Sequence, residues 1–197
     1  MVEITAMEKA DNEIVADLVV KARQGSKEAF SRLVRLLMKN VVALTYRMTQ
    51  DKDSAFDLAQ ETFVTAWQRL SDFRGESSFG AWLYRIATNK TLNYLKQQSG
   101  RREMSLDDAV LEVLPPQASS ADPEQSMRDK QLQQHVLAFM AQLPPQQRLV
   151  FDLRFYKEMS FEEITHITGR AVGTVKTHYR LAVAKLRSVA QRGGWRR

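Results

Sequence analysis

Apolar residues recur at intervals of three and four along this chain of 197 residues, which is the spacing of one face of an α-helix. The alternation of apolar and polar residues that indicates β-strands is absent throughout. Capping residues, glycines and prolines interrupt the helical pattern at several points. The pattern therefore predicts an all-α fold of two small helical domains, each with enough apolar side chains for its own core.

The stretch DLAQETFVTAW, residues 57–67, belongs to a segment with two stripes at helical spacing. One stripe is apolar and is expected to face the core; it consists of Phe56, Ala59, Phe63, Trp67 and Leu70. The other gathers carboxylates and amides; it consists of Asp57, Gln60, Glu61, Val64 and Gln68. The chain has a formal net charge of +6, so the question is what this acidic face binds.

Capping residues and breakers place the ends of the expected helices. In the first domain the helices are expected to begin at Asn12, at Ser26, at Asp51 or Asp53 and near Ser78, and the last of them to end near Gln98. The predicted plan is an N-terminal extension over residues 1–12, a first domain over 13–98, a linker over 99–125, a second domain over 126–192 and a basic tail over 193–197.

The linker differs from both domains in composition. It holds three of the five prolines, much of the acidic charge and no sustained helical period. A short apolar patch inside it consists of Val110, Leu111, Val113 and Leu114. Two interpretations of this patch stay open: a helical turn that docks on the protein itself, or a segment that lies in a channel of another protein.

The second domain ends in a pattern typical of a helix-turn-helix. The sequence SFEE, residues 160–163, is a capping box that opens a short helix over Phe161–Thr168. A break at TGRA leads to a long helix from about Val172 to Gln191. Before this pair, two prolines are expected to open a helix with three inward residues; the positions are Pro144, Pro145, Leu149, Val150 and Leu153.

The start of the long helix carries a basic, hydrogen-bonding surface. Its expected outward positions are Arg170, Thr174, Lys176, Thr177, His178 and Arg180. From Ile164 to Arg197 there are eight basic residues and no acidic one, whereas ordinary exposed helices mix both signs. Because the start of the second helix of such a motif enters the major groove, we expect this surface to bind DNA.

Aromatic and cationic side chains alternate between Phe73 and Gln97. Unpaired bases stack on aromatic rings while their phosphates pair with cations, so this segment is a candidate site for single-stranded nucleic acid. Phe79 is expected in the core, and Phe73, in a loop before a glycine, is hard to explain by packing. For Trp82, Tyr84 and Tyr94 both roles stay open. Helical spacing places Arg85, Asn89, Asn93 and Lys96 on one face.

The composition excludes several classes of protein. The chain has no cysteine, which excludes a disulfide framework, a thiolate metal site and a redox switch of its own. The N-terminus is acidic and lacks an apolar run, and no stretch of about 18 uncharged apolar residues occurs. The sequence therefore predicts a soluble, cytoplasmic protein without membrane insertion.

A helical metalloenzyme is a further hypothesis. Glu163 and His166 have the Glu-x-x-His spacing of carboxylate-bridged metal sites. The motif occurs once, and the capping box already needs Glu163, so a metal site is disfavoured. No phosphate-binding glycine loop or nucleophile elbow is present. We predict no catalytic residue, no metal and no enzymatic activity.

Two stretches resemble one family of proteins. DSAFDLAQETFVTAWQRLSDFRGESSFGAWLYRIATNKTLNYLKQ, residues 53–97, resembles the second region of bacterial RNA polymerase sigma factors of the extracytoplasmic-function (ECF) group. LPPQQRLVFDLRFYKEMSFEEITHITGRAVGTVKTHYRLAVAKLR, residues 143–187, resembles the fourth region of the same group. Both occur in the family's order with a short linker, so the resemblance covers nearly all of residues 13–190.

The resemblance implies a role for each part of the chain. Asp57, Gln60 and Glu61 would dock on the coiled coil of the RNA polymerase clamp. The second region would open the promoter and capture bases of the −10 element; the residues implied are Phe73, Arg74, Trp82, Arg85, Asn89 and Lys96. The fourth region would bind the −35 element and the polymerase flap, and the linker would thread the RNA channel. An anti-sigma factor is implied as a regulator, and no cofactor is implied.

The long helix of the second domain differs from the family's usual pattern at several positions. Ala171 stands where the family commonly has serine or proline, and arginines are common where His178, Leu181 and Val183 stand. A different −35 sequence is therefore expected. The alternative function is a two-domain helix-turn-helix regulator whose N-terminal helices bind a small ligand or an acidic partner. Contact of Asp57 and Glu61 with RNA polymerase would discriminate the two.

Overall fold

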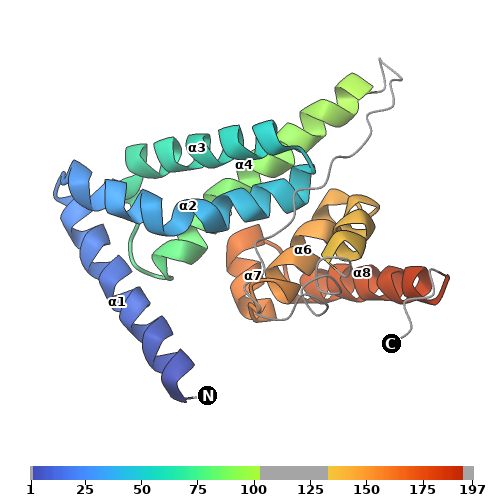
Figure 1. The fold of residues 1–197 in the computed structure, drawn as a ribbon. Coiled ribbons are helices and arrows are strands. Elements are labelled where there is room, and N and C mark those ends of the chain that lie inside the picture. The colour runs from blue at the N-terminus through green and yellow to red at the C-terminus, as the bar shows by residue number, and fades with distance from the viewer. Residues whose placement is uncertain (1, 103–132, 193–197) are drawn as a thin grey trace, which may run out of the picture.

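The structure, a computed structural model, describes residues 2–102 and 133–192 (Figure 1). Within these ranges every regular element is a helix, which confirms the all-α prediction. The helices are α1 (Val2–Arg23), α2 (Lys27–Thr49), α3 (Lys52–Gln68), the short 3-10 helix η1 (Leu70–Asp72), α4 (Phe79–Arg102), the helical segment 133–141, α6 (Pro145–Phe155), α7 (Phe161–Thr168) and α8 (Val172–Arg192). The apolar patch of the linker and the basic tail lie outside the described residues.

Side-chain caps fix the starts of the helices in the first domain. The Ser26 hydroxyl accepts a hydrogen bond from the backbone N–H of Ala29 at 3.2 Å. Of the two aspartates proposed for α3, Asp51 is the cap, since its carboxylate accepts from the N–H of Ser54 at 2.7 Å. The predicted start of α1 at Asn12 is wrong: the helix begins at Val2, because residues 2–11 contain no glycine or proline to stop it.

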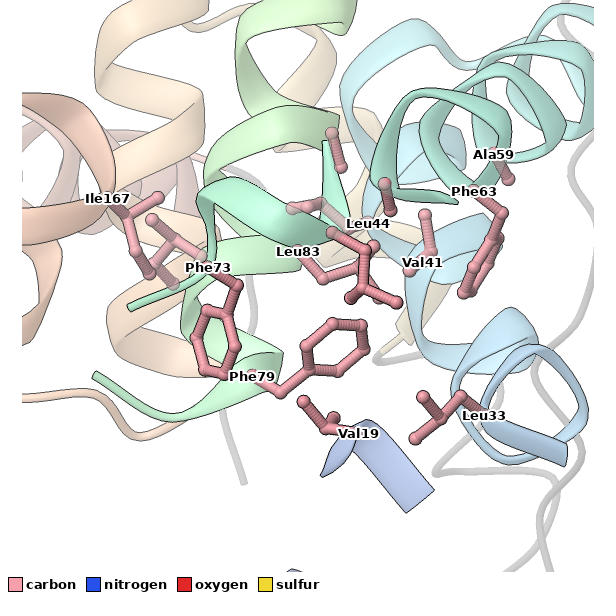
Figure 2. Close-up of a cluster of buried hydrophobic side chains, with 14 of the residues drawn as sticks. Val19, Leu33, Val41, Leu44, Ala59, Phe63, Phe73, Phe79, Leu83 and Ile167 are labelled. Carbon is pink, nitrogen blue, oxygen red and sulfur yellow. The ribbon is translucent and has the colours of Figure 1, made fainter. Parts of the chain in front are cut away.

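The first four helices bury one apolar cluster (Figure 2). Leu33 and Leu44 of α2, Phe63 of α3 and Leu83 of α4 are at most 4% exposed. The apolar stripe predicted for α3 is wrong at Phe56, whose side chain is 48% exposed. The buried face of α3 runs instead through Ala55, Leu58, Ala59, Thr62, Phe63 and Ala66, one position away from Phe56.

The second domain is a helix-turn-helix packed on α6 and the segment 133–141. The capping box of α7 is complete: the Ser160 hydroxyl accepts from the N–H of Glu163 at 3.1 Å, and the Glu163 carboxylate accepts from the N–H of Ser160 at 2.7 Å. Gly169 ends α7 with φ +66°, a left-handed conformation that glycine tolerates best. The bounds predicted for α7 and the inward residues predicted for α6 are confirmed.

The two domains lie against each other. Figure 1 shows α6 and α7 beneath α2 and α4. Leu153 of α6 and Ile167 of α7 are buried in the same apolar cluster as Leu83 of α4. The side chain of Ile167 lies on the side of this cluster where Phe73 is found (Figure 2). The core of the first domain therefore continues into the second.

Candidate functional site

The acidic face of α3, defined here as Asp57, Gln60 and Glu61, is exposed as its helical spacing predicted. Two exposed apolar residues flank this face: Phe56 is 48% exposed and Val64 is 57% exposed. The Glu61 carboxylate pairs with Nζ of Lys90 on α4 at 3.1 Å. Exposed apolar groups beside carboxylates and an amide suit a protein partner with both basic and apolar side chains.

A cavity of about 340 Å³ lies between the loop before α4, α4 itself and α7. Its lining residues are Asp72, Phe73, Arg74, Gly75, Glu76, Ser77, Ala81, Trp82, Arg85, His166 and Ile167. Gly75 has φ +77°, so the loop that lines the cavity makes a turn that glycine favours. Four of the residues expected at the −10 element meet at this cavity, which we call the loop pocket; they are Phe73, Arg74, Trp82 and Arg85.

Phe73 is a core residue, so the expectation that packing would not explain its position is wrong. Its side chain is 9% exposed and contacts the Phe79 ring edge-on, with ring centroids 5.6 Å apart. The Trp82 ring lies 5.5 Å from that of Phe73 and is only half-buried. Phe73 therefore forms the floor of the loop pocket as part of the core, and Trp82 offers the more accessible ring.

The two tyrosines whose role the sequence left open both pack within the protein. The Tyr94 hydroxyl lies 2.6 Å from Oγ of Ser54 on α3 and accepts from Gln98 at 2.8 Å. Tyr84 faces the second domain, where Nζ of Lys157 lies 5.3 Å from the centre of its ring. Burial raises the pKa of Tyr84.

The predicted polar face of α4 is confirmed as a surface. Arg85, Asn89, Asn93 and Lys96 are all exposed, as is Arg74 in the preceding loop. Arg85 also lines the loop pocket, so this face begins at the pocket. A ring, amides and cations are thus arranged along one side of the first domain, which suits single-stranded nucleic acid.

The basic surface of α8 is exposed at Arg170, Thr174, Lys176, Thr177 and Arg180. His178, also expected to face outward, is only half-exposed, and its Nδ1 makes no hydrogen bond to any described residue. Burial and the nearby Arg170 cation lower the pKa of His178. This histidine is therefore a weaker candidate for a phosphate contact than its neighbours.

Internal contacts orient several side chains of this surface. Arg170 Nε donates to the side-chain oxygen of Gln146 at 3.2 Å, and the Thr177 hydroxyl donates to the carbonyl of Gly173 at 2.8 Å. Nζ of Lys176 lies 5.7 Å from the ring centre of Phe161. These contacts hold the donors near the start of α8, where a recognition helix meets base edges and phosphates.

The described residues contain no group of three or more His, Asp or Glu side chains that would hold a metal ion. Glu163, one half of the Glu-x-x-His motif, is bonded to the backbone of Ser160. Among the helices in the described part of the chain, none is long and apolar enough to span a lipid bilayer.

Sequence reasoning missed a charged cluster between the domains. Arg47 of α2 makes a two-point ion pair with Asp152 of α6; Nε donates to one carboxylate oxygen and Nη2 donates to the other at 3.1 Å. The Asp152 side chain is fully buried and that of Arg47 is 12% exposed. Burial raises the pKa of Asp152 while the Arg47 cation opposes this shift. The signal in the sequence was Arg148 and Asp152, one turn apart amid the apolar residues of α6.

Family models match both domains. The Sigma-70 region 2 model matches residues 33–101, and the Sigma-70 region 4 model matches residues 133–186. The ECF RNA polymerase sigma-E factor of Escherichia coli is 36% identical over 165 residues, which cover 81% of this chain and 85% of that protein. The RNA polymerase sigma-H factor of Pseudomonas aeruginosa is 34% identical over the same shares of both chains.

Solved structures show the same fold. The structure of CnrH in complex with the cytosolic domain of CnrY has a TM-score of 0.65 at 24% identity and covers 90% of this chain and 97% of that one. The sigma factor RpoE of Bartonella quintana, solved with the anti-sigma factor NepR, has a TM-score of 0.67 at 23% identity, with 82% and 96% covered. The two matched regions, in this order, and the level of identity to the sigma-E factor lead to one conclusion: the chain belongs to the ECF group of RNA polymerase sigma factors.

Proposed function

We propose that this sigma factor divides its work among three surfaces: the acidic face of α3 binds RNA polymerase, the loop pocket with the polar face of α4 opens the promoter at the −10 element, and the start of α8 binds the −35 element. The observation that carries the proposal is the position of the polar face of α4, which begins at the loop pocket through Arg85. The volume of the pocket falls within the range of about 300–1,000 Å³ that holds small ligands.

The acidic face of α3 is proposed to dock on the clamp coiled coil of RNA polymerase. Exposed Phe56 and Val64 add apolar area to the carboxylates of Asp57 and Glu61, so the contact does not rest on charge alone. Charge steers the encounter and the apolar groups slow dissociation. Docking would also bring the partner's basic groups into competition with Lys90 for Glu61.

Reversing Asp57 and Glu61 to lysine tests this contact. Both side chains are exposed, and such charges seldom contribute more than about 1 kcal/mol to folding, so the helical circular dichroism should be unchanged. Binding to core polymerase in a pull-down should be lost. Asp17→Lys, at an exposed carboxylate on α1, is the matched control and should bind normally. Undiminished binding of the α3 variant would refute the proposed docking face.

Promoter opening is proposed to use Trp82, Arg85 and Asn89. Trp82 offers a half-buried ring for stacking, Arg85 a cation for the phosphate, and Asn89, one turn further along α4, an amide for a base edge. In the second domain, Lys176 and Arg180 are proposed to contact phosphates or bases in the −35 major groove, with Thr174 as a further donor.

The remaining partners follow from the family. We propose that the second domain also contacts the polymerase flap and that an anti-sigma factor regulates the protein, as NepR is found bound to the sigma factor RpoE of Bartonella quintana. A sigma factor acts where RNA polymerase acts, so we place the protein in the cytoplasm. It directs the enzyme without performing catalysis itself, and it needs no cofactor.

Transcription with purified components tests the function as a whole. Core RNA polymerase supplemented with the protein should start transcripts from a defined set of genomic promoters, and sequencing their 5′ ends should reveal common −10 and −35 elements. Core enzyme alone should not produce these starts. If the protein binds core enzyme but adds no promoter-specific starts, the proposed role in initiation fails.

A further inference from the structure

The exposed surface of α8 has a basic edge and an uncharged edge. The basic edge consists of three exposed cations at positions i, i+4 and i+11, which are Lys176, Arg180 and Arg187. The uncharged edge consists of three exposed residues at positions i, i+3 and i+7, which are Thr174, Thr177 and Leu181. Because this helix is proposed to enter the major groove, the two edges would meet different parts of the DNA.

Two residues beside the uncharged edge could carry a positive charge, but neither presents one to a ligand. Lys185, one turn beyond Leu181, donates to the backbone carbonyl of Gln142 at 2.6 Å. His178 is half-buried, and burial and the Arg170 cation lower its pKa, so its ring is uncharged at neutral pH. This edge is therefore suited to the edges of bases, and the basic edge to phosphates.

Leu181 is the apolar residue of the uncharged edge, and packing within the protein does not account for it. Its side chain is 45% exposed, whereas Val183 and Leu186 pack against the core cluster of the second domain. Single exposed leucines are common on protein surfaces and need no explanation by themselves. This one lies on the surface proposed to meet DNA, at a position where arginine is common in the family. An apolar group thus takes the place of a cation there.

Thr177 brings a methyl group to the same edge. Its hydroxyl donates to the carbonyl of Gly173 at 2.8 Å, so its one donor is already used within the helix. The methyl group has no such bond, and Thr177 lies one turn before Leu181. A Cβ added at Gly173 would meet nothing within 4 Å, so the surface of the first turn of α8 is open to a ligand.

Apolar groups in a major groove favour one base of the four. Guanine, adenine and cytosine present hydrogen-bonding groups there, and an apolar side chain would leave these groups without a partner. Thymine presents a methyl group at C5 beside its O4 acceptor. Contact between this methyl group and a leucine removes apolar surface from water on both sides, which is favourable.

We propose that Leu181, together with the methyl group of Thr177, selects −35 elements that have thymine opposite the uncharged edge, by contact with the thymine 5-methyl groups. This inference rests on the proposed binding of the −35 element by α8, and it names the base that the helix selects. The basic edge supplies affinity for any sequence through phosphates. Leu181 is a specificity-determining residue, because its contact distinguishes one base from the others.

Removal of single methyl groups from the DNA tests this contact. The −35 duplex is taken from the promoters found by sequencing transcript 5′ ends, and each thymine is replaced in turn by uracil, which lacks the methyl group and keeps the same hydrogen bonds. In fluorescence anisotropy with the full-length protein, at least one replacement should weaken binding by about three- to fivefold, as expected for one buried methyl group. Leu181→Ala should bind the thymine and uracil duplexes at that position equally.

Three further variants sharpen the test. Leu36→Ala is the matched control, since it removes a 52% exposed leucine of α2 outside the proposed DNA surfaces and should discriminate like the wild type. Thr177→Ser keeps the hydroxyl bonded to Gly173 and loses only the methyl group, so it should abolish the uracil effect at a neighbouring thymine. Leu181→Arg should lose the discrimination and raise the salt dependence by about one unit. Circular dichroism checks that each variant keeps its helices.

The outcomes separate this inference from the proposed function. If no uracil replacement weakens binding, or if both Leu181 variants keep the full uracil effect, Leu181 does not contact a thymine methyl group and the inference is overturned. If the wild type binds the −35 duplex no more tightly than a duplex of scrambled sequence, the proposed role of α8 fails and the inference fails with it. Loss of the uracil effect in both Leu181 variants, with the effect retained in Leu36→Ala, is the expected result.

Discussion

The polar faces of α4 and α8 are both exposed and both carry cations, but their surroundings differ. The face of α4 begins at a cavity that contains the Phe73 and Trp82 rings, and between its end cations Arg85 and Lys96 it carries two asparagines. The surface of α8 follows the tight turn at Gly169 and carries cations and threonines. The face of α4 adjoins a cavity lined by aromatic rings, and the face of α8 is a convex helix surface.

This difference matches the proposed division of work, in which the first domain holds an unpaired base and the second domain binds a duplex. An unpaired base needs a ring to stack on and space to enter, so the rings that form the pocket must also be held rigidly by the core. A duplex needs only a helix that fits the major groove, and affinity then comes from cations at phosphates. The first domain should therefore be sensitive to changes in packing, and the second to changes in charge.

The largest expected effect is a loss of folding stability when a ring that packs at the loop pocket is removed. Phe73→Ala removes a ring that is 9% exposed, and such changes lower the free energy of unfolding by about 3–5 kcal/mol. Urea denaturation of the full-length chain measures the loss. Trp82→Ala, at a half-buried ring, should cost less. If Phe73→Ala lowered the free energy of unfolding by much less than Trp82→Ala does, Phe73 would not be a core residue. It would then again be a candidate for contact with a base.

The next effect concerns opening of the promoter. Asn89→Ala removes an exposed amide, so folding should be unchanged while strand opening falls by roughly tenfold, as expected for the loss of one base contact worth about 1–3 kcal/mol. Permanganate reactivity of unpaired thymines measures opening, and a template with a pre-melted bubble should partly rescue the variant. Gln97→Ala, another exposed amide of α4, is the control. Equal opening by the Asn89 variant and wild type would show that this amide does not hold a base.

A smaller and uniform effect is expected at α8. Lys176→Ala and Arg180→Ala should each weaken binding to all −35 duplexes alike and reduce the salt dependence by about one unit if the cation contacts a phosphate. A base contact would instead cost roughly 1–3 kcal/mol at one position of the duplex. Fluorescence anisotropy at several salt concentrations separates these cases. If neither variant binds differently, the start of α8 does not contact the duplex.

The smallest effect tests the first domain without touching any DNA surface. The Ser54 hydroxyl and backbone N–H lower the pKa of Asp51, so the stabilisation from this cap is present above the ordinary pKa of an aspartate and is lost as the pH falls through the lowered value. Asp51→Ala should lower the free energy of unfolding by about 1 kcal/mol near pH 7 and by progressively less in acid. Thermal unfolding across pH measures this. Ser26→Ala, at an uncharged cap, should cost the same at every pH.

Local features of this fold could be predicted from the sequence because they depend on neighbours in the chain. The cap at Ser26, the capping box of Ser160 and Glu163, and the turn at Gly169 each involve residues at most four positions apart. The exposed face with Arg85 and Asn89 followed from helical spacing alone. For such features the amino-acid sequence contains all the information that the geometry needs.

Features that depend on distant segments could not be predicted in the same way. The burial of Phe73 results from Phe79 and Trp82 closing over a loop, and loop composition alone suggested exposure. The half-burial of His178 and the exposure of Phe56 each depend on the rotation of a helix within its bundle. The pairing of Arg47 with Asp152 joins positions whose sequence neighbourhoods share no pattern.

The ion pair between Arg47 of α2 and Asp152 of α6 also has a consequence for synthesis of the chain. Translation adds about 5–20 residues per second from the N-terminus, so α2 and α4 leave the ribosome several seconds before α6 is complete. During that interval no second domain exists to cover Phe73 and Trp82. Each newly made molecule therefore passes through a nascent state in which the loop pocket has no wall from α7.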